Sequence, residues 1–128
     1  MNAELEPCVF CRIDPGAIQS ENDFAFAVLD GFPVTPLHTL VISKRHTPDY
    51  FSLTEPELMA CNELLCSLRT KILAEDQSVS GFNIGINAGA VAGQTIFHCH
   101  IHLIPRRHGD VDNPRGGVRH LIPGKGNY

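Results

Sequence analysis

The stretch Gly93-Gln94-Thr95-Ile96-Phe97-His98-Cys99-His100-Ile101-His102-Leu103-Ile104-Pro105 places three histidines at every second position of an apolar segment. An apolar pattern with a period of two predicts a β-strand. Successive side chains of a strand point to opposite faces, so the three histidines are expected on one face and the residues between them on the other. Neighbours on one face lie about 6.6 Å apart. Two or three imidazoles could therefore reach the same small anionic group.

Three histidines in this pattern fit two kinds of chemistry. Burying three polar rings along a sheet face is costly without partners, which disfavours a purely structural role. A neutral imidazole can act as a nucleophile or as a general acid or base. A His-x-His pair is also typical of catalytic zinc sites. The spacing alone does not separate a catalytic triad from a metal site.

The composition fits one ordinary domain. The chain has 128 residues, of which 43% are hydrophobic, enough to bury one core. Met1–Pro7 shows neither a basic nor an apolar leader pattern, and no stretch approaches the roughly 18 apolar residues of a membrane span. The five cysteines are an odd number, which argues against a disulfide scaffold. We therefore expect a cytoplasmic protein with no membrane partner.

Charge is unevenly distributed along the chain. The net charge of −4 gives no case for nucleic-acid binding. From residue 106 onward the chain carries five Lys or Arg and two Asp, a local charge of +3, against −7 for residues 1–105. A basic tail after the histidine strand suits a small polyanionic ligand, or it is simply a solvated end.

Other segments predict strands and one long helix. Alternation of apolar residues indicates strands over 23–29, 39–43 and 81–87. Thr54 followed by Glu57 is a capping box, and the helix it starts should run to about Ala74. The helix stripe expected to be buried recurs at intervals of three and four. It comprises Leu58, Cys61, Leu64, Leu65, Leu68, Ile72 and Leu73.

The pair Cys8-Val9-Phe10-Cys11 is a second chemical motif. Two cysteines at this spacing can give two thiolates to one tetrahedral ion. Redox pairs of this kind normally follow a strand at the start of a helix, and the sequence before Cys8 provides no strand. Zinc binding is therefore the better interpretation, although spacing alone does not identify the other two ligands.

Thr95–Pro105 resembles the His-φ-His-φ-His-φ-φ signature, with φ apolar, of the histidine-triad family of nucleotide hydrolases and transferases. Asp30–His46 is similar to the upstream half of that family, and Asn87–Gly89 with Ala92–Gln94 to the stretch before the triad. The resemblance runs from about Cys8 to Arg107. It implies one α+β domain over residues 1–128, with an antiparallel sheet of about five strands, one long helix and one short helix.

The resemblance also implies a role for each matching residue. His100 would attack an α-phosphorus and form a nucleotidyl-histidine, while His38 and His102 surround the phosphate and His98 completes the triad. Asp30 would accept hydrogen bonds from ribose hydroxyls, and Phe10, Val28 and Phe32 could line the base. Three residues match positions that bind phosphate oxygens, namely Asn87, Gln94 and Thr95. One structural zinc per chain would be held by Cys8, Cys11, His46 and His98.

The resemblance implies a homodimeric nucleotide hydrolase. The similarity of the basic tail to bacterial members favours dinucleoside polyphosphates such as diadenosine tetraphosphate as substrates. A purine nucleoside phosphoramidase is the alternative within the family. Two other classes stay open, a zinc hydrolase with the metal on His98, His100 and His102, and a non-catalytic nucleotide-binding or zinc-stabilised interaction module.

Overall fold

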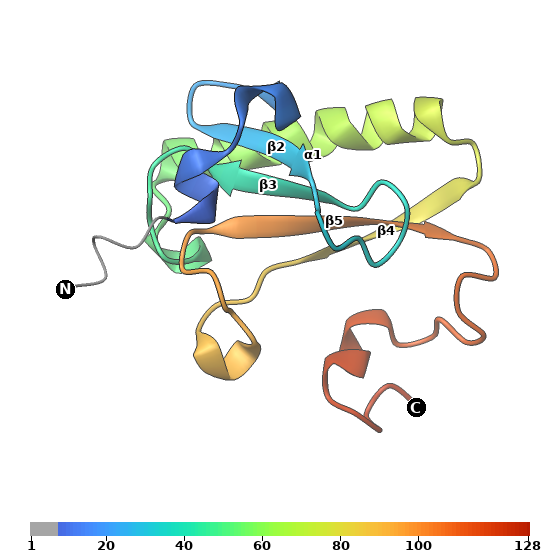
Figure 1. Ribbon diagram of the computed structural model, residues 1–128. Coiled ribbons are helices and arrows are strands. Elements are labelled where there is room, and N and C mark those ends of the chain that lie inside the picture. Colours follow the sequence, from blue (N-terminus) through green and yellow to red (C-terminus); the bar gives the residue numbers. More distant parts are fainter. Residues whose placement is uncertain (1–7) are drawn as a thin grey trace.

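The computed structural model describes residues 8–128, so the Met1–Pro7 segment lies outside the described residues. Its centre is one antiparallel sheet with the strand order β1-β2-β3-β5-β4 (Figure 1). The strands are β1 (Ile18–Glu21), β2 (Ala25–Leu29), β3 (Thr39–Ser43), β4 (Val79–Gly85) and β5 (His100–Arg107). The predicted α+β fold with a five-stranded antiparallel sheet is confirmed.

The long helix α1 (Glu55–Glu75) begins where the capping box predicts. The Thr54 hydroxyl accepts a hydrogen bond from the Glu57 N–H at 3.3 Å, and the Glu57 carboxylate accepts one from the Thr54 N–H at 2.8 Å. α1 is the one α-helix among residues 8–128, and the shorter helix that was expected corresponds to 3₁₀ turns such as Val9–Arg12. Figure 1 shows α1 along one face of the sheet and the C-terminal tail on the opposite side.

Leu58 was predicted to be buried as part of the helix stripe, and this prediction is wrong. Leu58 is 38% exposed, whereas Ala60, which the pattern left out, is buried. The stripe shifts because Glu57 is also buried, held there by the capping box and by Arg45. Burial at the first turn of α1 is therefore decided by a charged pair rather than by apolar periodicity.

The observed strands differ from the predicted ones in two places. β1 has the sequence Ile-Gln-Ser-Glu and was not predicted, because only one of its four residues is apolar. His98 lies just before β5, not within it. The Cys99 N–H donates to the Thr47 carbonyl at 2.7 Å, and the Ser43 N–H donates to the Cys99 carbonyl at 3.3 Å. These bonds draw the chain at 98–99 toward the loop after β3, where His98 meets a different set of partners from His100.

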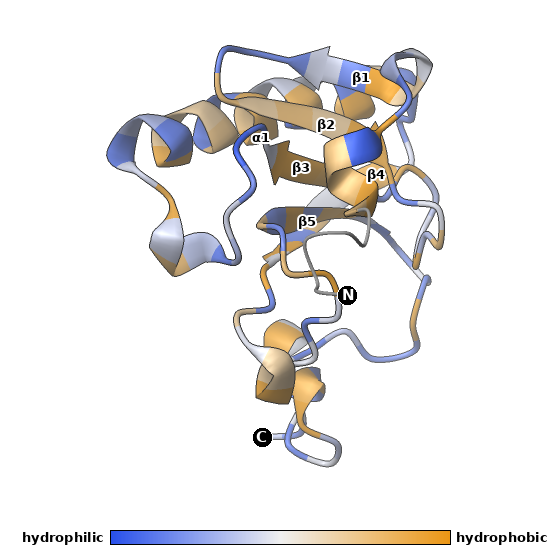
Figure 2. Cartoon of the chain, turned by 60° about the vertical axis from the view of Figure 1, so that its left-hand side comes forward, coloured by the Kyte–Doolittle hydropathy of each residue, from blue (hydrophilic) through white to orange (hydrophobic). Residues whose placement is uncertain are grey.

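The sheet has two different faces. One face packs on α1 through residues such as Val41, Ile101 and Leu103. On the other face, Leu40 and Ile42 of β3 form a second apolar cluster with Phe10. Apolar residues follow β2 and β3, and both hydropathy colours alternate around α1 (Figure 2). β5 presents His100 and His102 on the second face, beside this cluster and not covered by α1.

The tail after β5 folds back on itself, and contacts between its own residues hold it in this conformation. The guanidinium groups of Arg115 and Arg119 lie 4.4 and 4.9 Å from the centre of the Tyr128 ring. Gly126 is buried against the His120 ring, which would have to move if residue 126 carried a Cβ atom. Two arginines of the basic tail, Arg115 and Arg119, thus stack on Tyr128.

Candidate active site and metal centre

Four predicted metal ligands come together and are here named the thiol cluster: Cys8, Cys11, His46 and His98. The His98 Nδ1 atom lies 3.4 Å from Cys8 Sγ, 3.5 Å from Cys11 Sγ and 3.2 Å from His46 Nδ1. With Zn–S near 2.3 Å and Zn–N near 2.0 Å, tetrahedral zinc sets its donor atoms about 3.3–3.8 Å apart. The donor atoms therefore fit one tetrahedral zinc ion.

His98 is oriented for metal binding by its second ring nitrogen. Its Nε2 lies 2.6 Å from the Ser43 carbonyl oxygen. Because a carbonyl only accepts, Nε2 carries the proton and the Nδ1 lone pair faces the thiol cluster. Burial, the largest cause, lowers the pKa of the fully buried His98 ring, and nearby His46 and His100 add to this effect. His98 is thereby kept neutral, as a metal ligand requires.

An ion pair fixes the segment that carries His46. The Arg45 guanidinium donates to both carboxylate oxygens of Glu57, at 2.8 and 2.9 Å. These hydrogen bonds lower the pKa of Glu57 to about 2. The residue next to His46 is therefore tied to the first turn of α1, which limits where the His46 ring can lie.

His100 has the opposite ring orientation. Its Nδ1 lies 2.8 Å from the His98 carbonyl oxygen, so Nδ1 carries the proton. The lone pair of the neutral ring is then on Nε2. Phe10 packs against His100 with the ring centres 4.9 Å apart, and it also contacts His98. His100 thus lies on β5 next to the thiol cluster. Its Nε2 atom is the ring nitrogen that no hydrogen bond within residues 8–128 uses.

A second group, here named the acid–base cluster, contains Asp30, His38 and His102. His38 Nε2 lies 2.9 Å from His102 Nδ1 and 3.4 Å from the Asp30 carboxylate. The Val34 N–H donates to His38 Nδ1 at 3.1 Å, so the His38 proton is on Nε2 and points at His102. His102 then accepts on Nδ1 and carries its own proton on Nε2.

Burial lowers the pKa of both histidines in the acid–base cluster. Desolvation is the largest cause for His38 and for His102, and the Asp30 charge opposes it in both. For His102 the neighbouring His100 and His38 lower the pKa further. The cluster therefore holds two neutral rings beside one carboxylate, an arrangement suited to passing a proton.

The alternative zinc site on His98, His100 and His102 is not supported. Each ring uses Nδ1 toward a different partner: His98 toward the thiol cluster, His100 toward a carbonyl and His102 toward His38. The two groups of potential metal donors found among the described residues do not place these three rings together.

The residues predicted to bind phosphate oxygens differ in their burial and in their hydrogen bonds. Gln94 is buried and fully engaged, because its oxygen accepts from the Gly89 N–H at 2.8 Å and its nitrogen donates to Pro48 at 2.6 Å and Ile96 at 3.1 Å. Gln94 thus positions the loop after β4. Asn87 is half-buried and Thr95 is exposed near this loop.

Of the three predicted base contacts, only Phe32 presents a free surface. Phe32 is 91% exposed and follows Asp30, whereas Phe10 and Val28 belong to the buried cluster on β3. The Asp30 carboxylate accepts the Phe32 N–H at 2.8 Å. This bond holds the turn that carries Phe32 beside the acid–base cluster.

Sequence reasoning missed the backbone groups that fix each ring. The Ser43 carbonyl, the His98 carbonyl and the Val34 N–H decide which nitrogen of His98, His100 and His38 is protonated. Any residue type supplies such groups, so the sequence carries no signal for them.

No α-helix within residues 8–128 has the length and apolar character needed to cross a membrane.

Comparison with known proteins gives one consistent family. The HIT domain family matches residues 14–109. An uncharacterized HIT-like protein of Mycoplasma genitalium is 44% identical over 103 residues, covering 77% of this chain and 72% of the relative.

Two solved structures are similar to this chain. A zinc-bound histidine triad family protein from Mycobacterium smegmatis has a TM-score of 0.66 at 36% identity, covering 80% of this chain and 77% of that protein. Plasmodium falciparum diadenosine triphosphate hydrolase has a TM-score of 0.68 at 30% identity, covering 79% of this chain and 68% of that protein.

Proposed function

Because this chain belongs to the HIT domain family, we propose that it is a nucleotide hydrolase in which His100 forms a nucleotidyl-histidine intermediate. The observation that carries the proposal is the 2.8 Å contact from His100 Nδ1 to the His98 carbonyl, which leaves the Nε2 lone pair for attack. The similarity to a diadenosine triphosphate hydrolase supports the reaction class.

The proposed reaction has two steps. First, His100 Nε2 forms a bond to the α-phosphorus while the bond from phosphorus to the leaving group breaks. The leaving group departs with a proton from the imidazolium form of His102, which becomes neutral as that proton leaves Nε2. Second, water attacks the same phosphorus, the P–N bond to His100 breaks, and the proton of the water returns to His102. The lowered pKa of His102 supports this role, because it keeps the ring neutral between steps.

The remaining residues have proposed binding roles. Asn87, Thr95 and the N–H groups of the loop after β4 would stabilise charge on the phosphoryl oxygens, with Gln94 holding that loop in place. Asp30 would accept the ribose hydroxyls while its other oxygen faces His38 and His102. Phe32, with Phe10 and Val28 behind, would contact the base.

The leaving group has two candidates. A dinucleoside polyphosphate such as diadenosine tetraphosphate is expected if the tail arginines bind phosphate. Arg115 and Arg119 stack on Tyr128, however, and Arg106 and Arg107 are paired with Asp110 and Asp76. These pairings favour the second candidate, a nucleoside phosphoramidate or related nucleotide whose leaving group is uncharged.

We propose one structural zinc ion on the thiol cluster. The donor distances and the metal-facing lone pair of His98 support it, as does the zinc-bound relative. Zinc there would stabilise the fold and fix His98, whose carbonyl orients His100.

We also propose a homodimer in the cytoplasm. β4 is an edge strand of the sheet, and Ile84 on it is 53% exposed, so a second chain could cover this edge. All five cysteines are unpaired, which is typical of a reducing compartment.

The test is His100→Asn, compared with the wild type on a panel of nucleotide substrates. We expect turnover to fall by about three orders of magnitude or more, while AMP binding measured by calorimetry is retained. Turnover close to wild type would contradict His100 as the nucleophile. A wild-type protein that binds AMP but hydrolyses no nucleotide would instead identify a non-catalytic binding module.

A further inference from the structure

Leu37 is the one residue other than glycine that has a positive φ angle, 71°, among residues 8–128. It lies in a four-residue turn that the His38 N–H closes on the Thr35 carbonyl at 3.1 Å. Because the ring of Pro36 fixes a negative φ, a positive φ at the next residue makes this a type II turn. Glycine or asparagine is usual at that position, since a larger side chain is strained there. A type I turn would relieve the strain, so another part of the molecule selects type II.

The peptide group between Pro36 and Leu37 distinguishes the two turn types. Turning this group over converts type II into type I, moves the Pro36 carbonyl to the other side of the turn and makes the φ of Leu37 negative. A hydrogen bond to that carbonyl therefore selects one turn type. The Arg107 guanidinium gives this bond, because its Nη2 donates to the Pro36 carbonyl at 3.0 Å.

Arg107 is itself fixed at the end of β5. Its side chain is 15% exposed. Nη2 also donates to the Asp76 carboxylate at 2.8 Å, and Nε donates to the Ser78 hydroxyl at 3.2 Å. Asp76 ends α1, and hydrogen bonds from Ser78 and Arg107 lower the pKa of its carboxyl to about 2. The guanidinium is thus held between the end of α1 and the turn.

The turn also determines how the His38 ring is held. Thr35 Oγ1 donates to the Pro105 carbonyl at 2.7 Å, a second bond between the turn and the end of β5. The Val34 N–H donates to His38 Nδ1 at 3.1 Å, and His38 Nε2 lies 2.9 Å from His102 Nδ1. Val34 and His38 flank the turn, so the shape of the turn sets whether the N–H meets the ring.

We propose that Arg107 is a positioning residue for His38. Its bond to the Pro36 carbonyl keeps Leu37 in the left-handed conformation, and the turn in this form holds the His38 ring against His102. Without that bond Leu37 relaxes to a negative φ, and the backbone contact that fixes the proton on His38 Nε2 is lost. The catalytic consequence rests on the proposed function, in which the acid–base cluster transfers the proton.

The experiment combines Arg107→Gln with Leu37→Gly and follows the turn by NMR. A type II turn gives a strong nuclear Overhauser effect (NOE) between the Hα of Pro36 and the N–H of residue 37, whereas a type I turn gives a weak one. Arg107→Gln should weaken this NOE and change the ring nitrogen signals of His38. It should also lower kcat by up to about 10²-fold, the scale of a small misplacement, with little change in KM.

Adding Leu37→Gly to Arg107→Gln should restore the NOE, the His38 signals and kcat. Glycine adopts a positive φ without strain, so the type II turn no longer needs the bond from Arg107. A role of Arg107 in holding the end of α1 alone predicts no rescue, because glycine in the turn does not replace the contact with Asp76.

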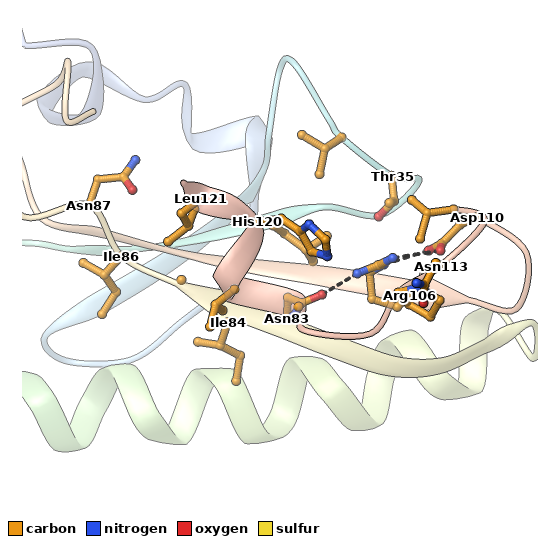
Figure 3. A pocket seen from close by; sticks show the side chains of 17 residues that line it. Thr35, Asn83, Ile84, Ile86, Asn87, Arg106, Asp110, Asn113, His120 and Leu121 are labelled. Atoms are coloured by element: carbon orange, nitrogen blue, oxygen red, sulfur yellow. Dashed lines mark hydrogen bonds and ion pairs between the residues drawn. The ribbon is translucent and has the colours of Figure 1, made fainter. Parts of the chain in front are cut away.

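Arg106→Gln is the matched control. Arg106 is the neighbouring arginine but lies on the other face of β5, where it donates to Asp110 and Asn83 (Figure 3). Its replacement should leave the NOE and the His38 signals as in the wild type.

Leu37→Val gives a second test that keeps Arg107 in place, in case Arg107→Gln does not fold. A β-branched side chain is the most strained at a positive φ, so this variant should weaken the NOE and change the His38 signals. Leu37→Gly alone should retain both. Equal His38 signals in these two variants would contradict the link between the turn and the ring.

A strong NOE in Arg107→Gln would overturn the proposal, because packing of Leu37 on the core next to α1 would then select the turn. A weakened NOE with unchanged His38 signals, or no rescue by Leu37→Gly, would overturn it as well. Wild-type protein without turnover on any nucleotide would remove the hydrolase alone. The NOE and the His38 signals would still confirm or overturn the positioning by Arg107.

Discussion

The thiol cluster and the acid–base cluster use histidines from the same short segment for different chemistry. In the thiol cluster, the His98 Nε2–H donates a hydrogen bond to a carbonyl, and Nδ1 faces two cysteines. In the acid–base cluster, His102 turns Nδ1 toward His38 and lies 3.9 Å from the Asp30 carboxylate. The role of each ring is thus decided by what the other nitrogen contacts, not by its place in the His-x-His-x-His pattern.

His100 lies between the two clusters and depends on the first. The carbonyl that accepts the hydrogen bond from His100 Nδ1–H belongs to His98, a member of the thiol cluster. We therefore expect changes in the thiol cluster to affect zinc content, stability and activity, and changes in the acid–base cluster to affect activity without loss of zinc.

The largest expected effect follows from breaking the thiol cluster. Cys8→Ser removes one of four donors, so the protein should lose stoichiometric zinc and several kcal/mol of unfolding free energy, since metal binding to thiolates is linked to folding. Elemental analysis and thermal unfolding measure both quantities. Cys66→Ser is the control, because Cys66 is exposed on α1 and outside the cluster. Wild-type protein purified without chelator that contains no zinc would contradict this account.

Breaking the acid–base cluster should leave the metal in place. His102→Asn removes the proposed proton donor, and kcat should fall by about 10²–10⁴-fold, the usual contribution of general acid–base catalysis. Zinc content should equal that of the wild type. His108→Asn, in the exposed turn after β5, should change neither quantity. If His102→Asn lost zinc, the two clusters would not be separate.

A smaller effect is expected on the pH dependence of the unfolding free energy, through His38 of the acid–base cluster. His38 has a pKa below the ordinary value of 6.5 because burial disfavours its charged form. Below that pH the unfolded chain takes up a proton that the folded protein does not, so acidification lowers the unfolding free energy. Urea unfolding should therefore lose more stability between pH 7.5 and 5.5 in the wild type than in His38→Asn. Both proteins keep the thiol cluster, so equal losses would show that His38 is not the cause.

The sequence was sufficient where local pattern decides structure. Alternation located β3 at its observed bounds, and the Thr54–Glu57 capping box located the start of α1. The four members of the thiol cluster were expected as ligands from family resemblance, and the structure brings them together. Such features depend on side-chain type at fixed spacing, which a sequence displays directly.

The sequence was insufficient where backbone groups, or residues far apart in the chain, determine the position of a side chain. The displacement of His98 from β5 depends on hydrogen bonds to Thr47 and Ser43. The stacking of Arg115 and Arg119 on Tyr128 depends on a partner near the end of the tail. Neither contact has a signature in the amino-acid pattern, because the partners are separated along the chain and one of them is main chain.

The most direct test of the central claim is to trap the covalent intermediate. Wild-type protein mixed with a nucleoside phosphoramidate and quenched during the first turnover should carry one nucleotidyl group, and peptide mass spectrometry should locate it on His100. The same quench of His100→Asn should yield unmodified protein. A nucleotidyl group on His98 or His102, or single-turnover hydrolysis in which the protein is never modified, would contradict the account.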